Sequence, residues 1–451
     1  MRGVLLRDIA RHLGVFCESE LQISGYQADS RMIQPGELFF ALKGEKNDGH
    51  LFLAEAAQRG AVGAVVSKGF LGSVGGLILL GVEDVQGALQ ELARNSMAEH
   101  SVPMIGITGS VGKTTTKEFL ATLLEGKFRT GKSPSSFNSK VTYPLNLLNR
   151  TGDEQVVVLE LGMSAPREIL NLVQIAAPDI AILTKVALAH ALQFPDGLSG
   201  IARAKGEIFS QDKTKTAIFD MEFMEYPEIV SSIRAEKVTF STQNASADYF
   251  LSMAEGRYRL DERGVRAFEF DLPFKEGHLL QNFAAAIAGA RQMGMQWEEI
   301  ERQIPRLHLP KMRFEQFEKA GVWFINDAYN ANPASMRAAL ENLPEPKEGC
   351  KRIAVLATMK ELGAFSVEAH QEIGRLAQKR IDVLLCLGEE TAPLCEAYRE
   401  SMKPAELFYD HLMLAEKLNE IMRPGDVVLL KGSRSMQLEK LLEMIHVAPL
   451  C

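Results

Sequence analysis

The chain has 451 residues, of which 46% are hydrophobic and 24% charged, with a net charge of -8. This is the composition of an ordinary globular protein, long enough for about three domains of roughly 150 residues each. The acidic balance argues against nucleic acid as the main partner, because phosphate backbones are bound by clustered Lys and Arg.

The first residues, MRGVLLRDIARHLGV, predict an amphipathic helix and not a signal peptide. Leu5, Ile9 and Leu13 recur at helical spacing, and Asp8 interrupts the apolar run. No uncharged apolar run reaches the roughly 18 residues of a membrane span. Five scattered cysteines without a C-x-x-C pair indicate reduced thiols in a cytoplasmic protein.

Short apolar runs alternate with helical patterns along the chain, which predicts an α/β fold with mostly parallel sheets. Around 221–275 the pattern is less regular, and YRLDERGVRAFEFDL is typical of antiparallel strands. The clearest buried strands, rich in Val, Ile and Leu on both faces, are Met104–Thr108, Val156–Leu161, Ile180–Thr184, Ile353–Leu356, Val383–Leu387 and Val427–Leu430.

Two segments favour domain boundaries: MAEHSVP, which precedes a new strand, and PRLHLPKMRFE. They predict three domains, 1–98, 99–312 and 313–451.

Residues 106–118, GITGSVGKTTTKE, join an apolar strand to a helical pattern through a Gly-rich turn. A phosphate-binding loop needs this context, since its backbone N–H groups and the helix N-terminus face the phosphates. Lys113 would supply positive charge to the β- and γ-phosphates, and Thr114 a hydroxyl to Mg²⁺. Ile107 stands where the general motif has its first glycine, and a purely structural turn is the alternative. The predicted nucleotide-binding residues are Gly109, Ser110, Gly112, Lys113, Thr114 and Thr115.

Three further residues follow the loop. Glu160 ends the strand VVVLE and is well placed to bind Mg²⁺, although a strand-end Glu can equally be solvated. His190 lies in a turn after the strand AILT, where a lone His is more often structural. Lys205 lies in IARAKGEIF, at the expected start of a helix, and by itself would be a solvated surface charge.

The order of these motifs resembles the Mur ligase family along nearly the whole chain. DAYNANPASM is similar to the member that adds D-alanyl-D-alanine, and residues 28–66 are similar to the UDP-binding domain of the late members. The other matching segments are TGSVGKTTTKE, LELGMS at 159–164, TKVALAH at 184–190, IARAKGEIF at 201–209, HLLQN at 278–282, MKELG at 359–363 and KGSRS at 431–435.

The resemblance implies a small α/β N-terminal domain, a central P-loop ATPase-like domain with a parallel sheet, and a Rossmann-like C-terminal ligase domain. It implies that Thr114, Glu160 and His190 bind Mg²⁺ and that Lys205 carries a carbamate. The catalytic residues would be Lys113, His190 and Lys205. The implied ATP contacts are His278, Asn282, Arg313 and Asp327. The implied substrate residues are Ser30, Arg31, Asn138, Tyr329, Asn330, Asn332, Lys431, Ser433 and Arg434.

The implied activity is ATP-dependent ligation of D-alanyl-D-alanine to a UDP-N-acetylmuramoyl-tripeptide through an acyl phosphate, and the protein is expected to be a monomer. A folylpolyglutamate synthase-like ligase and a non-catalytic nucleotide-binding regulator are the alternatives. Some residues depart from the family pattern. Lys185 stands where Asn is usual, Asn326 where Asp is common, and Ser135 and Ser136 replace Gly-Asn.

Overall fold

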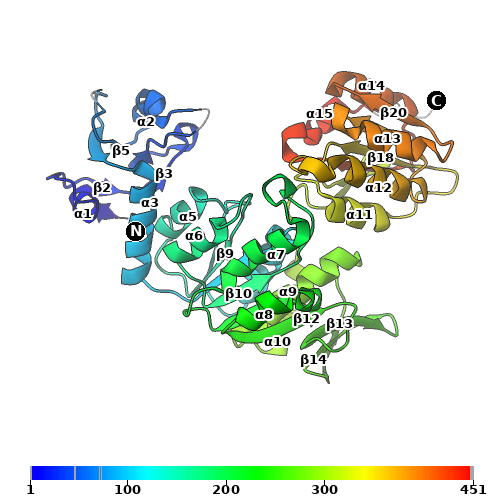
Figure 1. Cartoon of the computed structure of the whole chain (residues 1–451), viewed down its shortest axis with the longest axis horizontal. Helices are drawn as coiled ribbons and strands as arrows, with labels where there is room; N and C mark the ends of the chain where they lie inside the picture. The colour runs from blue at the N-terminus through cyan, green and yellow to red at the C-terminus, as the bar shows by residue number, and fades with distance from the viewer. Residues whose placement is uncertain (1–2, 45–46, 71, 73, 447–451) are drawn as a thin grey trace.

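The computed structural model describes residues 3–44, 47–70, 72 and 74–446. It contains three α/β units that follow one another along the chain and appear as separate lobes in Figure 1. The predicted fold class is confirmed, and each unit is built on a sheet in which most strands are parallel. None of the helices in these ranges combines the length and apolar character needed to cross a bilayer.

The N-terminal unit has a four-stranded parallel sheet of order β3-β4-β5-β6 and a short antiparallel β1–β2 pair. The side chain of Asn149, in the central unit, makes two hydrogen bonds to the main chain of Tyr26 in the N-terminal unit. It accepts from the Tyr26 N–H at 2.9 Å and donates to the Tyr26 carbonyl at 2.8 Å. Its strands are β1 Val4–Leu5, β2 Gln22–Ile23, β3 Gly25–Gln27, β4 Glu37–Phe40, β5 Gly63–Ser67 and β6 Ile78–Val82. Its helices are α1 Leu6–His12, α2 Leu53–Gln58 and α3 Val85–Glu99.

The central unit has a nine-stranded sheet of order β15-β14-β13-β12-β11-β10-β7-β9-β8. The strands from β8 to β13 run parallel, whereas β13, β14 and β15 pair antiparallel, as the sequence predicts. Its strands are β7 Met104–Thr108, β8 Thr130–Lys132, β9 Val156–Glu160, β10 Ile180–Leu183, β11 Thr216–Asp220, β12 Glu236–Ser241, β13 Tyr249–Ala254, β14 Arg257–Glu262 and β15 Val265–Phe270. Its helices are α4 Lys113–Leu124, α5 Thr142–Leu148, α6 Glu168–Ile175, α7 Gly197–Gly206, α8 Pro227–Ser232, α9 Gly277–Gln292 and α10 Trp297–Gln303.

The C-terminal unit has a six-stranded sheet of order β16-β17-β21-β18-β19-β20, parallel except for the β16–β17 pair. Its strands are β16 Glu315–Lys319, β17 Val322–Asn326, β18 Arg352–Ala357, β19 Val383–Leu387, β20 Ala405–Phe408 and β21 Val427–Lys431. Its helices are α11 Pro333–Glu341, α12 Ser366–Gln378, α13 Ala392–Arg399, α14 His411–Ile421 and α15 Leu441–Met444.

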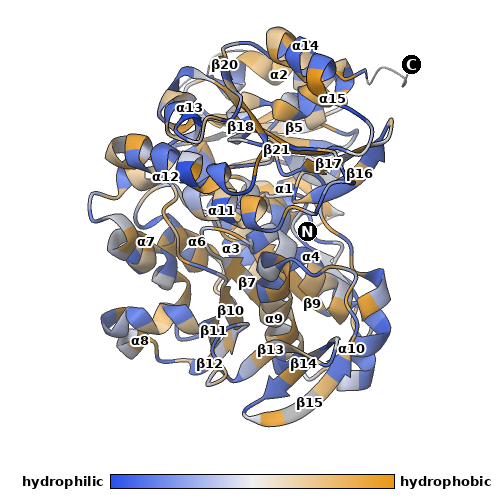
Figure 2. Ribbon diagram, turned by 90° about the vertical axis from the view of Figure 1, so that its right-hand side faces the viewer, coloured by the Kyte–Doolittle hydropathy of each residue, from blue (hydrophilic) through white to orange (hydrophobic). Residues whose placement is uncertain are grey.

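Helices cover both faces of the central sheet, which explains why its inner strands β7, β9 and β10 are buried along their whole length (Figure 2). Helices α4, α9 and α10 pack on one face, and the other face forms a core continuous with that of the N-terminal unit. All six strands predicted as buried are present. Strand β7 lies between β9 and β10, so the chain leaves it first to one side and later to the other. Ligands of open α/β sheets bind at such a point, beyond the carboxyl ends of the strands.

Candidate active site

A cleft of about 1690 Å³ lies between the central and C-terminal units, beyond the carboxyl end of β7. It brings together most of the residues predicted from the sequence, although they are spread over more than 300 positions. The central unit contributes Ser110, Gly112, Lys113, Thr114, Thr115, Asn138, Glu160, His190, His278 and Asn282, and the C-terminal side contributes Arg313, Asp327, Tyr329, Asn330, Asn332, Lys431, Ser433 and Arg434.

The predicted phosphate-binding loop joins β7 to α4. Two of its glycines are required, by the backbone conformation at one of them and by close side-chain neighbours at both. Gly112 has a φ of +86°, and a Cβ there would lie 2.2 Å from the side-chain oxygen of Asn282. A Cβ on Gly109 would lie 1.9 Å from the Thr184 hydroxyl. Side chains at either position would therefore push the loop away from α9 and β10.

Lys113 begins α4 and donates a 2.7 Å hydrogen bond to the Gly109 carbonyl, back across the loop. Burial lowers the pKa of its ammonium, and the nearby Glu160 carboxylate opposes that effect. The partner of the ammonium is a neutral carbonyl, and a charged acceptor such as a phosphate oxygen forms a stronger hydrogen bond. A phosphate can therefore take the place of the Gly109 carbonyl.

Glu160 is the last residue of β9 and is only 1% exposed, so it is not a solvated strand-end Glu. One carboxylate oxygen accepts from the Thr114 hydroxyl at 2.8 Å, and the other from the Asn138 amide at 2.7 Å. Among the described residues no Lys or Arg forms an ion pair with it. A buried carboxylate beside a hydroxyl at the cleft wall is the hard oxygen donor set that suits Mg²⁺.

Lys205 is 1% exposed, so the surface-charge alternative is wrong. Its predicted position at the start of a helix is also wrong: α7 begins at Gly197, and Lys205 lies in its last turn. The helix begins four residues before the segment IARAKGEIF, and the last three residues of that segment, 207–209, form a 3₁₀ turn. Burial, and then the neighbouring Lys113 ammonium, hold the pKa of Lys205 well below its ordinary value, while Glu160 opposes the shift.

His190 follows β10 in a left-handed conformation, with φ +56°. Its Nδ1 contacts the carboxylate of Glu361, which belongs to the C-terminal unit. The main chain adds a second link, since the Leu192 N–H donates to the Glu361 carbonyl at 3.0 Å. Within the described ranges no group of three His, Cys, Asp or Glu side chains is arranged to hold a metal. In this conformation the imidazole of His190 is bound to Glu361 of the C-terminal unit.

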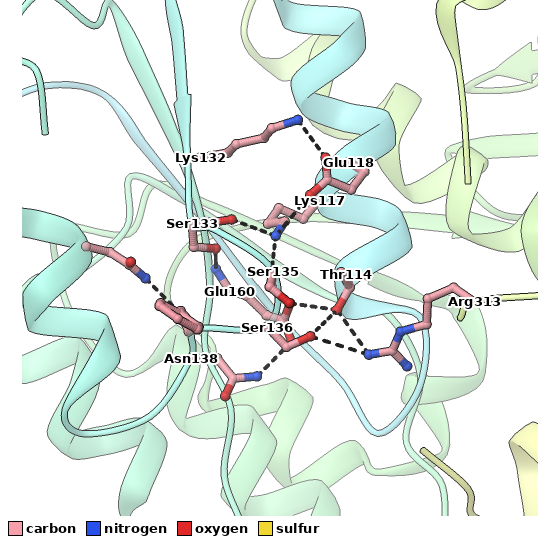
Figure 3. Close-up of polar contacts among 12 residues, drawn as sticks. Thr114, Lys117, Glu118, Lys132, Ser133, Ser135, Ser136, Asn138, Glu160 and Arg313 are labelled. Carbon is pink, nitrogen blue, oxygen red and sulfur yellow. Dashed lines mark hydrogen bonds and ion pairs between the residues drawn. The ribbon is translucent and has the colours of Figure 1, made fainter. Parts of the chain in front are cut away.

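Arg313 is the second bridge across the cleft. Its guanidinium lies 3.9 Å from the ring centre of Tyr329, and one nitrogen lies 3.3 Å from the Thr114 hydroxyl and 3.5 Å from the Ser136 hydroxyl (Figure 3). Stacking on a ring orients a guanidinium without using its hydrogen-bond donors. Arg313 is thus directed from the C-terminal side at the start of the phosphate-binding helix.

Asp327 follows β17 and links two segments of the C-terminal side of the cleft. It accepts from the Phe314 N–H at 3.0 Å and from the Lys431 ammonium at 2.5 Å. His278 lines the same cleft and is half-buried, with Nδ1 unpartnered within the described structure and its pKa lowered by burial. A neutral imidazole with an unused nitrogen can bind a polar ring or hydroxyl group of a ligand.

Four predicted residues do not line the cleft. Gly109 and Lys205 lie just behind its wall. Ser30 and Arg31 lie in the N-terminal unit, where Ser30 donates to Glu55 at 2.6 Å and Arg31 pairs with Asp29 at 2.6 Å. The structure does not bring this last pair to the nucleotide residues.

The residues that depart from the family pattern are all partnered. Lys185 forms a 3.0 Å ion pair with Glu222 at the cleft wall, and Asn326 donates to Glu315 at 3.2 Å. The structure also adds three residues to which the sequence gave no role: Lys117, Ser136 and Glu361. Lys117 and Glu361 lie inside the matched segments TGSVGKTTTKE and MKELG, which were the available signal. Ser136 stands out in the sequence only as a departure from the family pattern.

Three family models match the chain in order. They are "Mur ligase family, catalytic domain" over residues 22–96, "Mur ligase middle domain" over 107–290, and "Mur ligase, glutamate ligase domain" over 312–434.

Individual relatives match nearly end to end. The UDP-N-acetylmuramoyl-tripeptide--D-alanyl-D-alanine ligase of Bacillus subtilis is 31% identical over 95% of this chain and 94% of its own length. The crystal structure of the MurF ligase of Thermotoga maritima with ADP is 30% identical, has a TM-score of 0.77 and covers 93% of this chain and 96% of that one. A MurF structure from Acinetobacter baumannii is 28% identical, with a TM-score of 0.83 over 97% and 98%. On this full-length agreement in sequence and architecture, the chain belongs to the Mur ligase family.

Proposed function

We propose that this chain is an ATP-dependent, ADP-forming ligase that joins D-alanyl-D-alanine to a UDP-N-acetylmuramoyl-tripeptide. The observation that carries the proposal is the cleft, where a phosphate-binding loop on one domain faces Arg313 and the Asp327–Lys431 pair on the other. The names of relatives about 30% identical over the whole chain support the same reaction. The product would be the UDP-muramoyl-pentapeptide used to build peptidoglycan in the cytoplasm.

In this proposal the three functional domains are 1–98 for the UDP-sugar, 99–312 for ATP and 313–451 for the amine substrate. Lys113 and the N–H groups of the loop would bind the phosphates, and His278 and Asn282, which line the same cleft, would contact the adenosine. Ser30 and Arg31 would bind the UDP-sugar after giving up their present partners. The dipeptide would meet Tyr329, Asn330 and Asn332, with Lys431, Ser433 and Arg434 closing on both substrates.

Thr114 and Glu160 would hold Mg²⁺, which when bound neutralises charge on the phosphates. The Thr114 hydroxyl and the Glu160 carboxylate, 2.8 Å apart, fit that ion. His190 would join them after release from Glu361. Lys205 would carry a carbamate, because an amine kept neutral by burial reacts with CO2 and the carboxylate-like product would face the metal.

The reaction takes place in two displacements. A tripeptide carboxylate oxygen attacks the γ-phosphorus of ATP, the bond to ADP breaks, and an acyl phosphate forms. The dipeptide amine then attacks the acyl carbon, phosphate leaves with the C–O bonding pair, and the nitrogen loses a proton. Both steps bring negative groups together, so Lys113 and Arg313 act by position and charge.

A folylpolyglutamate synthase-like ligase has less support, because full-length relatives about 30% identical carry the muramoyl name. A regulator that only binds nucleotide has no need of a buried Glu160 and a buried Lys205 close to Lys113.

ADP release is the direct assay. We expect it to require both the UDP-tripeptide and D-alanyl-D-alanine, and to be much slower with D-glutamate or L-lysine as the amine. Equal or faster turnover with a single amino acid would refute the assignment. Running the assay with the meso-diaminopimelate and the lysine tripeptide would identify the natural third residue.

A further inference from the structure

Lys117 is a lysine with no exposed surface, one turn beyond Lys113 on α4. Its ammonium has three oxygen neighbours: the Ser133 carbonyl at 2.7 Å, the Ser135 carbonyl at 2.5 Å and the Glu118 carboxylate at 3.1 Å (Figure 3). An ammonium has three hydrogens to donate, so each has an acceptor. A buried charge is tolerated only when it is satisfied in this way.

The two carbonyls belong to the loop 133–138, whose ends are already fixed to β9. At one end the Ser133 hydroxyl accepts from the Glu160 N–H at 3.2 Å. At the other the Gly162 N–H donates to the Asn138 carbonyl at 2.9 Å. Between these anchors Ser135 has a φ of +45°, a strained conformation for a residue with a side chain. The bond from Lys117 is made to this strained residue.

The next residue is the one that reaches the cleft. The Ser136 hydroxyl lies 3.0 Å from the Thr114 hydroxyl and 3.5 Å from a guanidinium nitrogen of Arg313. In Figure 3 the Lys117 ammonium lies above Ser135, whereas Ser136, Thr114 and Arg313 lie together below it. Thr114 in turn donates to Glu160, so displacing this loop changes the surroundings of the proposed magnesium ligands.

We propose that Lys117 is a positioning residue. By holding the Ser133 and Ser135 carbonyls, it fixes the loop so that the Ser136 hydroxyl lies between Thr114 and Arg313 at the phosphate end of the cleft. Ser136 is then a contact for the magnesium–nucleotide complex. This inference rests on the proposed function for the identity of the ligand, and it names a buried residue that touches neither nucleotide nor metal.

The test is binding of Mg²⁺ with a nonhydrolysable ATP analogue, measured by calorimetry on the full chain. Lys117→Met should weaken that binding by roughly tenfold, because two carbonyls lose their donor and the loop moves. Lys132→Met is the matched control. Lys132 pairs with the same Glu118 at 2.6 Å and makes no hydrogen bond to the loop, so affinity should stay within about twofold.

A double-mutant cycle separates positioning from a general loss of structure. Ser136→Ala alone should weaken binding by about threefold, and adding it to Lys117→Met should cost nothing further, because both act through one loop. UDP-tripeptide affinity and the thermal midpoint of the Ser136→Ala variant should match the wild type. If Lys117→Met does not fold, Lys117→Gln, which keeps a donor, takes its place in the cycle.

Unchanged nucleotide affinity in the Lys117 variant, or additive losses in the cycle, would overturn the proposal. Failure of the wild-type chain to bind the analogue at all would instead overturn the proposed function, so the two failures can be distinguished.

Discussion

Lys117 and Lys205 lie in the same domain and are equally buried, at 0% and 1% exposed, but their surroundings are opposite. Lys117 has three oxygen acceptors around its ammonium. Lys205 makes no hydrogen bond through its amine within the described residues, and its neighbours include a second cation, Lys113. Burial alone therefore does not decide the state of a lysine. Acceptors occupy the ammonium of one lysine and give it a structural role, whereas burial without acceptors lowers the pKa of the other.

The strongest test of this contrast is Lys205→Ala. We expect the variant to lose ligation activity by roughly 10³-fold, because the proposed carbamate beside the proposed Mg²⁺ site is removed. Formate or acetate should restore part of the activity by occupying the vacated space, whereas neither should help Lys117→Met. Steady-state ADP release with and without added carboxylate measures both. Near-normal turnover of Lys205→Ala in CO2-depleted buffer would show that the lysine does not act through a carbamate.

Lys113→Ala removes the predicted phosphate contact and the cation that adds to the effect of burial in lowering the Lys205 pKa. Ligation should fall by about 10²-fold or more. UDP-tripeptide affinity should be nearly unchanged, because the predicted sugar residues Ser30 and Arg31 lie in another domain. Calorimetry with the UDP-substrate alone checks this. A large loss of that affinity would mean that the domain roles are wrongly divided.

Among the described residues Lys431 is a third buried lysine, at 1% exposed, and its shortest hydrogen bond is to the carboxylate of Asp327 at 2.5 Å. Lys431→Met should lower the free energy of unfolding by about 3 kcal/mol, because it leaves a largely buried carboxylate unpaired. Adding Asp327→Asn should recover part of the loss. Urea unfolding of the two variants measures the difference; a double variant no more stable than the single one would contradict the pairing.

Asp220 extends the contrast to a buried carboxylate. Burial is the main cause that raises its pKa from 3.8 to about 6, although the Glu222 N–H and the Gln281 amide donate to it. Because the pKa of Asp220 is higher in the folded protein, its protonation stabilises the fold. This stabilisation is complete below the unfolded pKa of 3.8 and is lost as the pH rises through about 6. Relative to Asp220→Asn, the wild type should therefore lose up to about 2–3 kcal/mol between pH 4 and pH 7. Urea unfolding at both pH values tests the sign. The prediction is refuted if the free energy of unfolding of the wild type rises relative to that of Asp220→Asn as the pH increases.

Local patterns in the sequence were sufficient for the α/β class, the buried strands and the phosphate-binding loop. These features depend on residues close together in the chain: apolar runs for β7 and β10, and glycines followed by Lys113 for the loop. The family resemblance supplied most of the remaining cleft residues, including Arg313 and Asp327, which no local pattern would have joined to Thr114.

Tertiary structure decided what the side chains do. A lysine in a sequence does not show whether acceptors will surround it, so the matched segment TGSVGKTTTKE gave Lys117 no role of its own and Lys205 resembled an ordinary surface charge. The Glu361–His190 contact forms between two domains, and the strained Ser135 places Ser136 beside Thr114 only because α4 and β9 hold the loop from both sides. Burial and acceptor geometry arise from contacts between distant segments, and these set the charge of a lysine.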